Sequence, residues 1–178
     1  MENSTKVITG KVRFSYANVF EPKSINGGEE KYSVSLIIPK SDTKTLADIR
    51  AAIELALKDG ISKFGGKVPE DLKLPLHDGD ADRPEDEAYK ECYFLNANSK
   101  DRPGVVDKNV KAILDQAEFY SGCYGRASIT FYAYNQNDNQ GIACGLQNLQ
   151  KLSEGEPLSG RSRAEEDFTP VEEEDFLA

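Results

Sequence analysis

Several residue types that support catalysis are scarce in this 178-residue sequence. His77 is the only histidine, which leaves little basis for an acid–base triad. The three cysteines, Cys92, Cys123 and Cys144, form no CxxC pair, and their odd number argues against a closed disulfide framework. A zinc site made from His77 and these cysteines would lack the closely spaced ligand pairs of structural zinc. We therefore expect no enzyme activity, no metal and no cofactor.

Long apolar runs are also missing. No segment approaches the ~20 apolar residues that a membrane-spanning helix needs. The start of the chain, residues 1–5 (MENST), lacks the charged-then-apolar pattern of a signal peptide. With the cysteine pattern, these features predict a reduced, soluble, intracellular protein that does not bind membranes.

Two segments resemble ligand-binding loops without completing the pattern. Residues 60–68 (GISKFGGKV) resemble a P-loop, but they contain an extra glycine, place Val68 where a metal-binding hydroxyl is needed, and follow a helix. Residues 78–89 begin like a calcium loop, but Arg83 and Tyr89 replace its glycine and its final glutamate. We interpret the second segment as a solvated acidic loop; a metal-dependent nuclease that uses the carboxylates of 78–87 is the weaker alternative.

Negative charge is concentrated in two parts of the sequence. The formal net charge is −9. Residues 164–178 hold seven acids and no base, and residues 78–91 hold seven acids and two bases, so the remainder of the chain is net +3. The acidic overall balance therefore hides a mildly basic body.

Hydrophobic periodicity predicts a mainly β protein. Alternating patterns and one helical pattern indicate strands at 6–16, 31–38, 92–97, 124–134 and 142–152 and a helix at about 42–59. The first strand should bury Val12, Phe14 and Tyr16, and the second should turn Lys31, Ser33 and Ser35 toward solvent. The composition of residues 60–90 predicts a long loop, with or without a short helix. This order predicts a small, mostly antiparallel barrel.

The strand at 124–134 has an unusual predicted outer side. Its odd-numbered residues are small and apolar, whereas its even-numbered side carries Tyr124, Arg126, Tyr132 and Tyr134. Single-stranded nucleic acid needs flat rings on which bases stack and cations that meet phosphates. Further candidate cations are Lys11, Arg13, Lys31, Lys100, Arg102 and Lys151. The alternative is that these tyrosines cover a loop or form a homodimer or oligomer contact.

The end of the chain differs in composition from the rest. From residue 153 onward it is too polar to pack, which predicts disorder. Four acids, Glu172, Glu173, Glu174 and Asp175, precede Phe176. Such a segment combines charge with a hydrophobic anchor, so we interpret it as a docking or self-inhibiting tail; a merely solubilising tail is the alternative.

The ordered segments resemble the phage single-stranded-DNA-binding proteins that have one oligonucleotide/oligosaccharide-binding (OB) barrel. The resemblance spans nearly the whole chain and no single piece of it is diagnostic. It rests on residues 10–20, 31–39, 94–99, 103–107, 120–126 and 141–151 and on the acidic tail that ends near Phe176.

The resemblance implies a five-stranded OB-type antiparallel barrel with an inserted helix in residues 1–152 and a flexible acidic tail in 153–178. It implies binding of single-stranded DNA in replication or recombination, in the cytoplasm of a bacterial host. Arg126 and tyrosines 124, 132 and 134 would lie in the groove. The tail would recruit replication proteins and compete with DNA. Because this chain ends Phe-Leu-Ala rather than on the aromatic residue, the identity of those proteins stays open. A phage structural or interaction protein that oligomerises through its tyrosines is the alternative.

Overall fold

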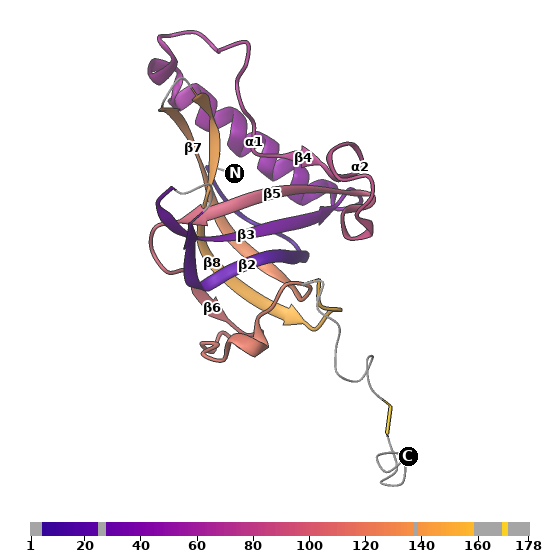
Figure 1. The fold of residues 1–178 in the computed structure, drawn as a ribbon. Helices are drawn as coiled ribbons and strands as arrows, with labels where there is room; N and C mark the ends of the chain where they lie inside the picture. Colours follow the sequence, from indigo (N-terminus) through magenta and orange to yellow (C-terminus); the bar gives the residue numbers. More distant parts are fainter. Residues whose placement is uncertain (1–4, 25–27, 137–138, 159–168, 171–178) are drawn as a thin grey trace.

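The structure is a computed structural model that describes residues 5–24, 28–136, 139–158 and 169–170. Short 3₁₀ turns at Ile61–Phe64, Glu87–Tyr89 and Gln116–Glu118 accompany the main elements. These elements are β1 (Lys6–Ile8), β2 (Val12–Ser24), β3 (Glu30–Pro39), α1 (Thr43–Asp59), β4 (His77–Asp78), α2 (Gly79–Asp82), β5 (Cys92–Ser99), β6 (Gly104–Val106), β7 (Tyr124–Gln136) and β8 (Asn139–Ser153) (Figure 1).

Five long strands close into a ring. β2 pairs with β3 and β7, β3 pairs with β5, and β7 pairs with β8, all antiparallel. A parallel contact between Asn98 of β5 and Gly145 of β8 completes the circle. The short strands β1, β4 and β6 pair with β7, β5 and β8 respectively. The predicted mainly β barrel of five strands with one inserted helix is thus confirmed.

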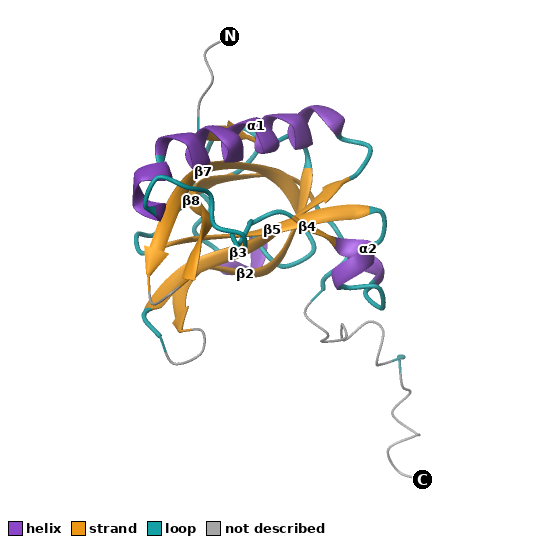
Figure 2. Ribbon diagram, turned by 90° about the horizontal axis from the view of Figure 1, so that it is seen from above, coloured by secondary structure: helices purple, strands orange, loops and turns teal. Residues whose placement is uncertain are grey.

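Helix α1 lies across the barrel beside β7 and β8, as Figure 2 shows from above. Its buried residues include Leu46, Ile49 and Ile53 at helical spacing, and they join the same hydrophobic core as Phe14 and Phe131 of the sheet. The predicted bounds were correct to within a residue: Asp42 caps the start and Gly60 the end. Within the described ranges, no helix combines the length and the apolar character that a bilayer span requires.

The start of α1 also fixes the turn between β1 and β2. Asp42 accepts hydrogen bonds from the backbone N–H of Thr45 (3.2 Å) and from its hydroxyl (2.7 Å), and the Thr45 hydroxyl accepts one from the N–H of Gly10 (2.9 Å). A Cβ at Gly10 would lie 2.7 Å from Asp42 Oδ2, so a larger residue there would displace the side chain that caps the helix.

Loss of this cap should destabilise the fold. We expect Asp42→Ala to lower the free energy of unfolding by about 1 kcal/mol, because a helix N–H loses its partner. Urea denaturation measures the change. Asp42→Asn keeps an N-cap acceptor and should lose clearly less; an equal loss in both variants would show that the cap is not the cause.

The first predicted strand is interrupted and its burial pattern shifts. Residues 6–16 form β1 and the start of β2, and Val12 and Phe14 are buried as predicted. The prediction for Tyr16 was wrong: its side chain is 59% exposed. The β2–β3 register shifts between Ser15 and Asn18, and Tyr16 has a φ of 47°. A bulge adds a residue and therefore re-aims the side chains that follow it.

The segment 78–91 covers the outer face of β3 and β5 and is called the cover below. Tyr89 is 1% exposed and packs with Ile37 and Phe94. Its hydroxyl lies 3.4 Å from that of Ser35, which is buried although solvent exposure was predicted. The acids of the cover are exposed or half-buried, in agreement with the interpretation as a solvated acidic loop, whereas Tyr89 packs its apolar side against the outer face of the sheet.

An ion pair fastens the cover to the end of β3. Lys40 Nζ lies 2.8 Å from both Asp78 Oδ1 and Asp80 Oδ2. This hydrogen bonding lowers the pKa of both carboxyls below the ordinary aspartate range and raises that of Lys40.

The two carboxyls should titrate below the ordinary aspartate pKa of about 3.9. Because the folded-state pKa is lowered, their contribution to stability is present above that ordinary value and is lost as the pH falls through the lowered pKa. Carboxyl NMR titration measures Asp78 and Asp80 directly. Lys40→Met should raise both values, whereas Lys44→Met, which removes an exposed lysine of α1, should leave them unchanged.

Candidate nucleic-acid interface

The two sides of β7 differ in burial as the sequence predicted. The odd-numbered residues from Gly125 to Ala133 are buried, whereas Arg126 and Tyr132 are exposed and Tyr124 and Tyr134 are half-buried. The outer side of this strand is therefore available to a ligand.

Small and polar residues form a continuous row across the barrel. The strand registers pair Asn18 with Ser33, Ser33 with Asn98, Asn98 with Gly145, and Gly145 with Thr130. The row thus crosses β2, β3, β5, β8 and β7 in turn, and each of its members is half-buried. Because these side chains are short, larger neighbours on both sides stand above them. The result is a shallow groove.

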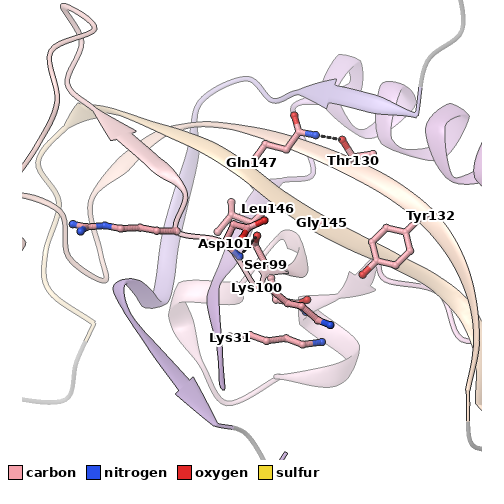
Figure 3. A pocket seen from close by; sticks show the side chains of 11 residues that line it. Lys31, Ser99, Lys100, Asp101, Thr130, Tyr132, Gly145, Leu146 and Gln147 are labelled. Carbon is pink, nitrogen blue, oxygen red and sulfur yellow. Dashed lines mark hydrogen bonds between the residues drawn. The ribbon is translucent and has the colours of Figure 1, made fainter. Parts of the chain in front are cut away.

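The first hollow of this groove has a volume of about 550 Å³ and lies where β5, β7 and β8 meet (Figure 3). Tyr132 lines it together with Lys31, Lys100 and Arg102. In Figure 3 the ammonium ends of Lys31 and Lys100 point toward the side of the pocket where Tyr132 stands. Four residues predicted separately from the sequence therefore come together here.

The Tyr132 ring lies beside Gly145, a residue without a side chain. A Cβ at Gly145 would meet its Cε1 atom at 3.5 Å, so the ring rests close to bare backbone. The side chain is 44% exposed, and burial of the remainder raises the pKa of its hydroxyl. The ring is therefore neutral at physiological pH and presents exposed aromatic surface to the groove.

Two further hollows adjoin the first, and Asn98 lines all three. The second, of about 390 Å³, contains Tyr134 and Lys73. The third, of about 480 Å³, contains Tyr16 and Arg83. All three share the outer surface of β5, and the second and third also share Asn96.

Positive charge dominates the lining. Among the described residues of the three hollows, six are Lys or Arg and Asp101 is the one acid. Lys100 also lies 3.5 Å from Glu29, but both side chains are largely exposed, so water screens this pair. The six cations are Lys23, Lys31, Lys73, Arg83, Lys100 and Arg102.

Three predicted site residues lie at the other end of β7. Lys11 Nζ and Arg13 Cζ stand 5.2 and 5.3 Å from the centre of the Tyr124 ring. Arg13 also donates hydrogen bonds to the carbonyls of Gly122 (3.0 Å) and Glu156 (2.6 Å). Since eight residues of extended strand span roughly 26 Å, this cluster is remote from Tyr132. The structure gives its members local partners rather than a place in the groove.

The two remaining predicted cations also lie outside the three hollows. Arg126 donates to the side-chain oxygen of Gln150. Lys151 pairs with Glu154, which also accepts a hydrogen bond from Tyr120. Residues just past 152 thus contact the barrel, and the division at 152/153 stays a prediction. Glu172, Glu173, Glu174, Asp175 and Phe176 lie outside the described residues.

Sequence reasoning missed one tyrosine and three cations that line the groove: Tyr16, Lys23, Lys73 and Arg83. A signal existed for one of them, because an arginine inside a run of acids is unusual. The bulge that turns Tyr16 outward leaves no mark in the alternating pattern. Within the described part of the chain, no three His, Cys, Asp or Glu residues are placed so that they could hold a metal ion.

Comparisons with known proteins agree with this geometry. Protein p50 of Acyrthosiphon pisum secondary endosymbiont phage 1 is 31% identical over 188 residues, which cover 97% of this chain and 99% of that protein. The single-stranded-DNA-binding protein of bacteriophage Enc34, solved in complex with single-stranded DNA, matches with a TM-score of 0.78 and 26% identity over 87% of this chain and 90% of that one.

A second solved structure supports the fold alone. The single-stranded-DNA-binding protein gp2.5 of bacteriophage T7 has a TM-score of 0.63 and 13% identity over 91% of this chain and 99% of that one. The OB-type barrel expected from the sequence is thus confirmed. The family model of the Enterobacter phage Enc34 ssDNA-binding protein matches residues 5–177. The chain therefore belongs to the Enc34 family of phage single-stranded-DNA-binding proteins.

Proposed function

We propose that this protein binds single-stranded DNA without sequence preference, in the groove that crosses β2, β3, β5, β8 and β7. The observation that carries the proposal is the first hollow, where the exposed Tyr132 ring stands among Lys31, Lys100 and Arg102. A neutral ring stacks on any base, and the three cations that line the same hollow can meet phosphates. Membership of a family of DNA-binding proteins supports the same conclusion.

The groove accounts for the lack of sequence preference. Stacking requires only the flat face that every base has, and phosphate contacts do not depend on the base. Binding should cover single strands, protect them and favour the melting of hairpins. The protein thereby takes part in phage DNA replication or recombination as a binding protein, not as an enzyme.

The tail has a separate part in the proposal. Residues 164–178 carry seven negative charges, and Phe176 follows the last four of them closely. Such a polyanion competes with DNA for the cations of the groove and recruits replication or recombination proteins once DNA has displaced it. Its competition should weaken as salt screens the charges.

Fluorescence anisotropy of a labelled oligo-dT tests both parts. The full-length chain and a chain stopped at Arg163 are each titrated at two salt concentrations. We expect binding that weakens with salt, with a slope of log K against log salt near −4 if each of the six groove cations neutralises one phosphate. The shortened chain should bind more tightly, and more so at the lower salt.

Three results would contradict the proposal. Equal affinity of the two chains would remove the competition by the tail and leave it as a partner peptide. Failure of both chains to bind, together with salt-insensitive self-association, would favour the oligomer contact. Magnesium-dependent cleavage of the oligonucleotide that Asp80→Asn abolishes would instead support the nuclease alternative.

A further inference from the structure

We infer that Tyr16 and Arg83 form a second stacking site for nucleic acid, at the opposite end of the groove from Tyr132. The inference rests on the proposed function and extends it. Neither residue was predicted to bind nucleic acid, since Tyr16 belongs to a strand face predicted to be buried and Arg83 to an acidic segment. The structure brings them together beside the third hollow.

The position of Tyr16 depends on a local departure from regular strand geometry. Its backbone has a φ of 47°, a conformation that a bulky residue other than glycine seldom adopts. The register shift between Ser15 and Asn18 turns the ring out of the core, where 59% of its surface is exposed. Strained backbone of this kind concentrates at functional sites. Here it places an aromatic ring at the edge of a hollow instead of in the apolar core.

Arg83 reaches this ring from the cover. Its guanidinium carbon lies 5.5 Å from the centre of the Tyr16 ring, 4.8 Å from that of Tyr89 and 4.9 Å from that of Phe94. Nη1 also lies 3.5 Å from the Tyr16 hydroxyl. The buried rings of Tyr89 and Phe94 thus hold the guanidinium beside the exposed one.

The charge of Arg83 is not neutralised locally. The cover contains seven acids, yet Arg83 forms no ion pair with any carboxylate that the structure describes. Two of these acids, Asp78 and Asp80, form ion pairs with Lys40 instead. An unpaired guanidinium beside an exposed ring is the combination that a phosphate and its base require.

The space between Tyr132 and Tyr16 is continuous and basic. The row of short residues from Thr130 to Asn18 spans four strand spacings, about 19 Å along the surface of the sheet. Lys31 lines the first hollow and Lys23 the third, and these two lysines are directly paired across β2 and β3. Like charges opposite each other destabilise a sheet, and a phosphate between them removes that repulsion.

The inferred path therefore begins at Tyr132, crosses Asn98, passes the lysine pair and ends at Tyr16. Beyond Arg83 the cover exposes Glu85, Asp86 and Glu87, which repel a polyanion and so set the end of the path. A short oligonucleotide can occupy the Tyr132 end alone, whereas a longer one engages both rings.

The test compares oligo-dT lengths within the 4–16 nucleotides that OB folds cover. Tyr16→Ala should weaken binding of the long oligonucleotides about 5- to 150-fold, the effect of one lost stack, and leave the shortest unchanged. Arg83→Gln should weaken the long ones too and reduce the salt slope by about 0.7. Tyr16→Phe keeps the ring and should bind like the unmodified chain at every length.

A fluorescence measurement keeps the test independent of folding effects. The sequence has no tryptophan, so Tyr16→Trp introduces a single reporter. Its emission should be quenched by long oligo-dT and not by the shortest. Leu114→Trp is the matched control, because Leu114 is 82% exposed and lines none of the three hollows; its emission should not respond.

The outcomes separate the two proposals. If Tyr132→Ala weakens binding but Tyr16→Ala has no effect at any oligonucleotide length, the second stacking site is overturned and the proposed function stands. The second stacking site is also overturned if, without DNA, the tryptophan emission of Tyr16→Trp is quenched as the protein concentration rises. That result would favour a contact between two copies of the protein. Absence of binding by the unmodified chain at every length would overturn both proposals.

Discussion

Replacing Lys31, Lys100 and Arg102 together by glutamine should reduce the slope of log K against log salt by about 2. Each phosphate that a cation neutralises contributes about 0.7 to that slope in single strands. All three side chains line the hollow around Tyr132, so their removal takes the cations away from the strongest candidate site. At low salt the affinity for oligo-dT should fall the most. Fluorescence anisotropy at four or more salt concentrations gives the slope.

A charge-matched variant serves as the control. Lys11, Lys108 and Arg126 lie outside the three hollows of the groove. Their joint replacement by glutamine changes the net charge by the same amount. It should alter the slope by much less, because these cations act only through their long-range field. Equal slopes in the two triple variants would show that DNA does not follow the groove and would favour the wider set of residues predicted from the sequence.

Removal of the Tyr132 ring should weaken binding at every oligonucleotide length. We expect Tyr132→Ala to weaken oligo-dT binding by about 1–3 kcal/mol, which is roughly 5- to 150-fold, because one base loses its stacking partner. The salt slope should stay the same, since no phosphate contact is removed. This combination of lower affinity and constant slope distinguishes a stacking residue from a cation.

Two controls accompany this substitution. Tyr132→Phe keeps the ring and should retain most of the affinity. Because 44% of the side chain is exposed, the alanine variant should also melt close to the unmodified chain. A loss much smaller than 1 kcal/mol would remove Tyr132 from the site, and a large fall in melting temperature would show that the ring has a structural role instead.

The sequence determined the elements of this fold because their patterns are local. Alternation at 124–134 fixes which side of β7 is buried, and the spacing of Leu46, Ile49 and Ile53 fixes the face of α1. Asp42 and Gly60 mark the ends of that helix. Such signals depend on periodicity over a few residues and survive without knowledge of the partner strands.

The sequence also determined the kind of chemistry. Rings and cations on one predicted strand face favour a single-stranded nucleic acid over a catalytic site. It did not determine which cations share a surface. Lys31 is distant in sequence from Lys100 and Arg102, yet all three line the same hollow as Tyr132, whereas Lys11 and Arg126 do not.

The remaining features of the site were decided by tertiary structure alone. The closure of the ring pairs Asn98 with Gly145 and so creates a row of short residues across five strands. A bulge turns Tyr16 outward against the alternation of its strand, and packing of Tyr89 folds an acidic segment over the sheet and carries Arg83 to the groove. These positions depend on register and on contacts between residues far apart in the chain, which no local pattern contains.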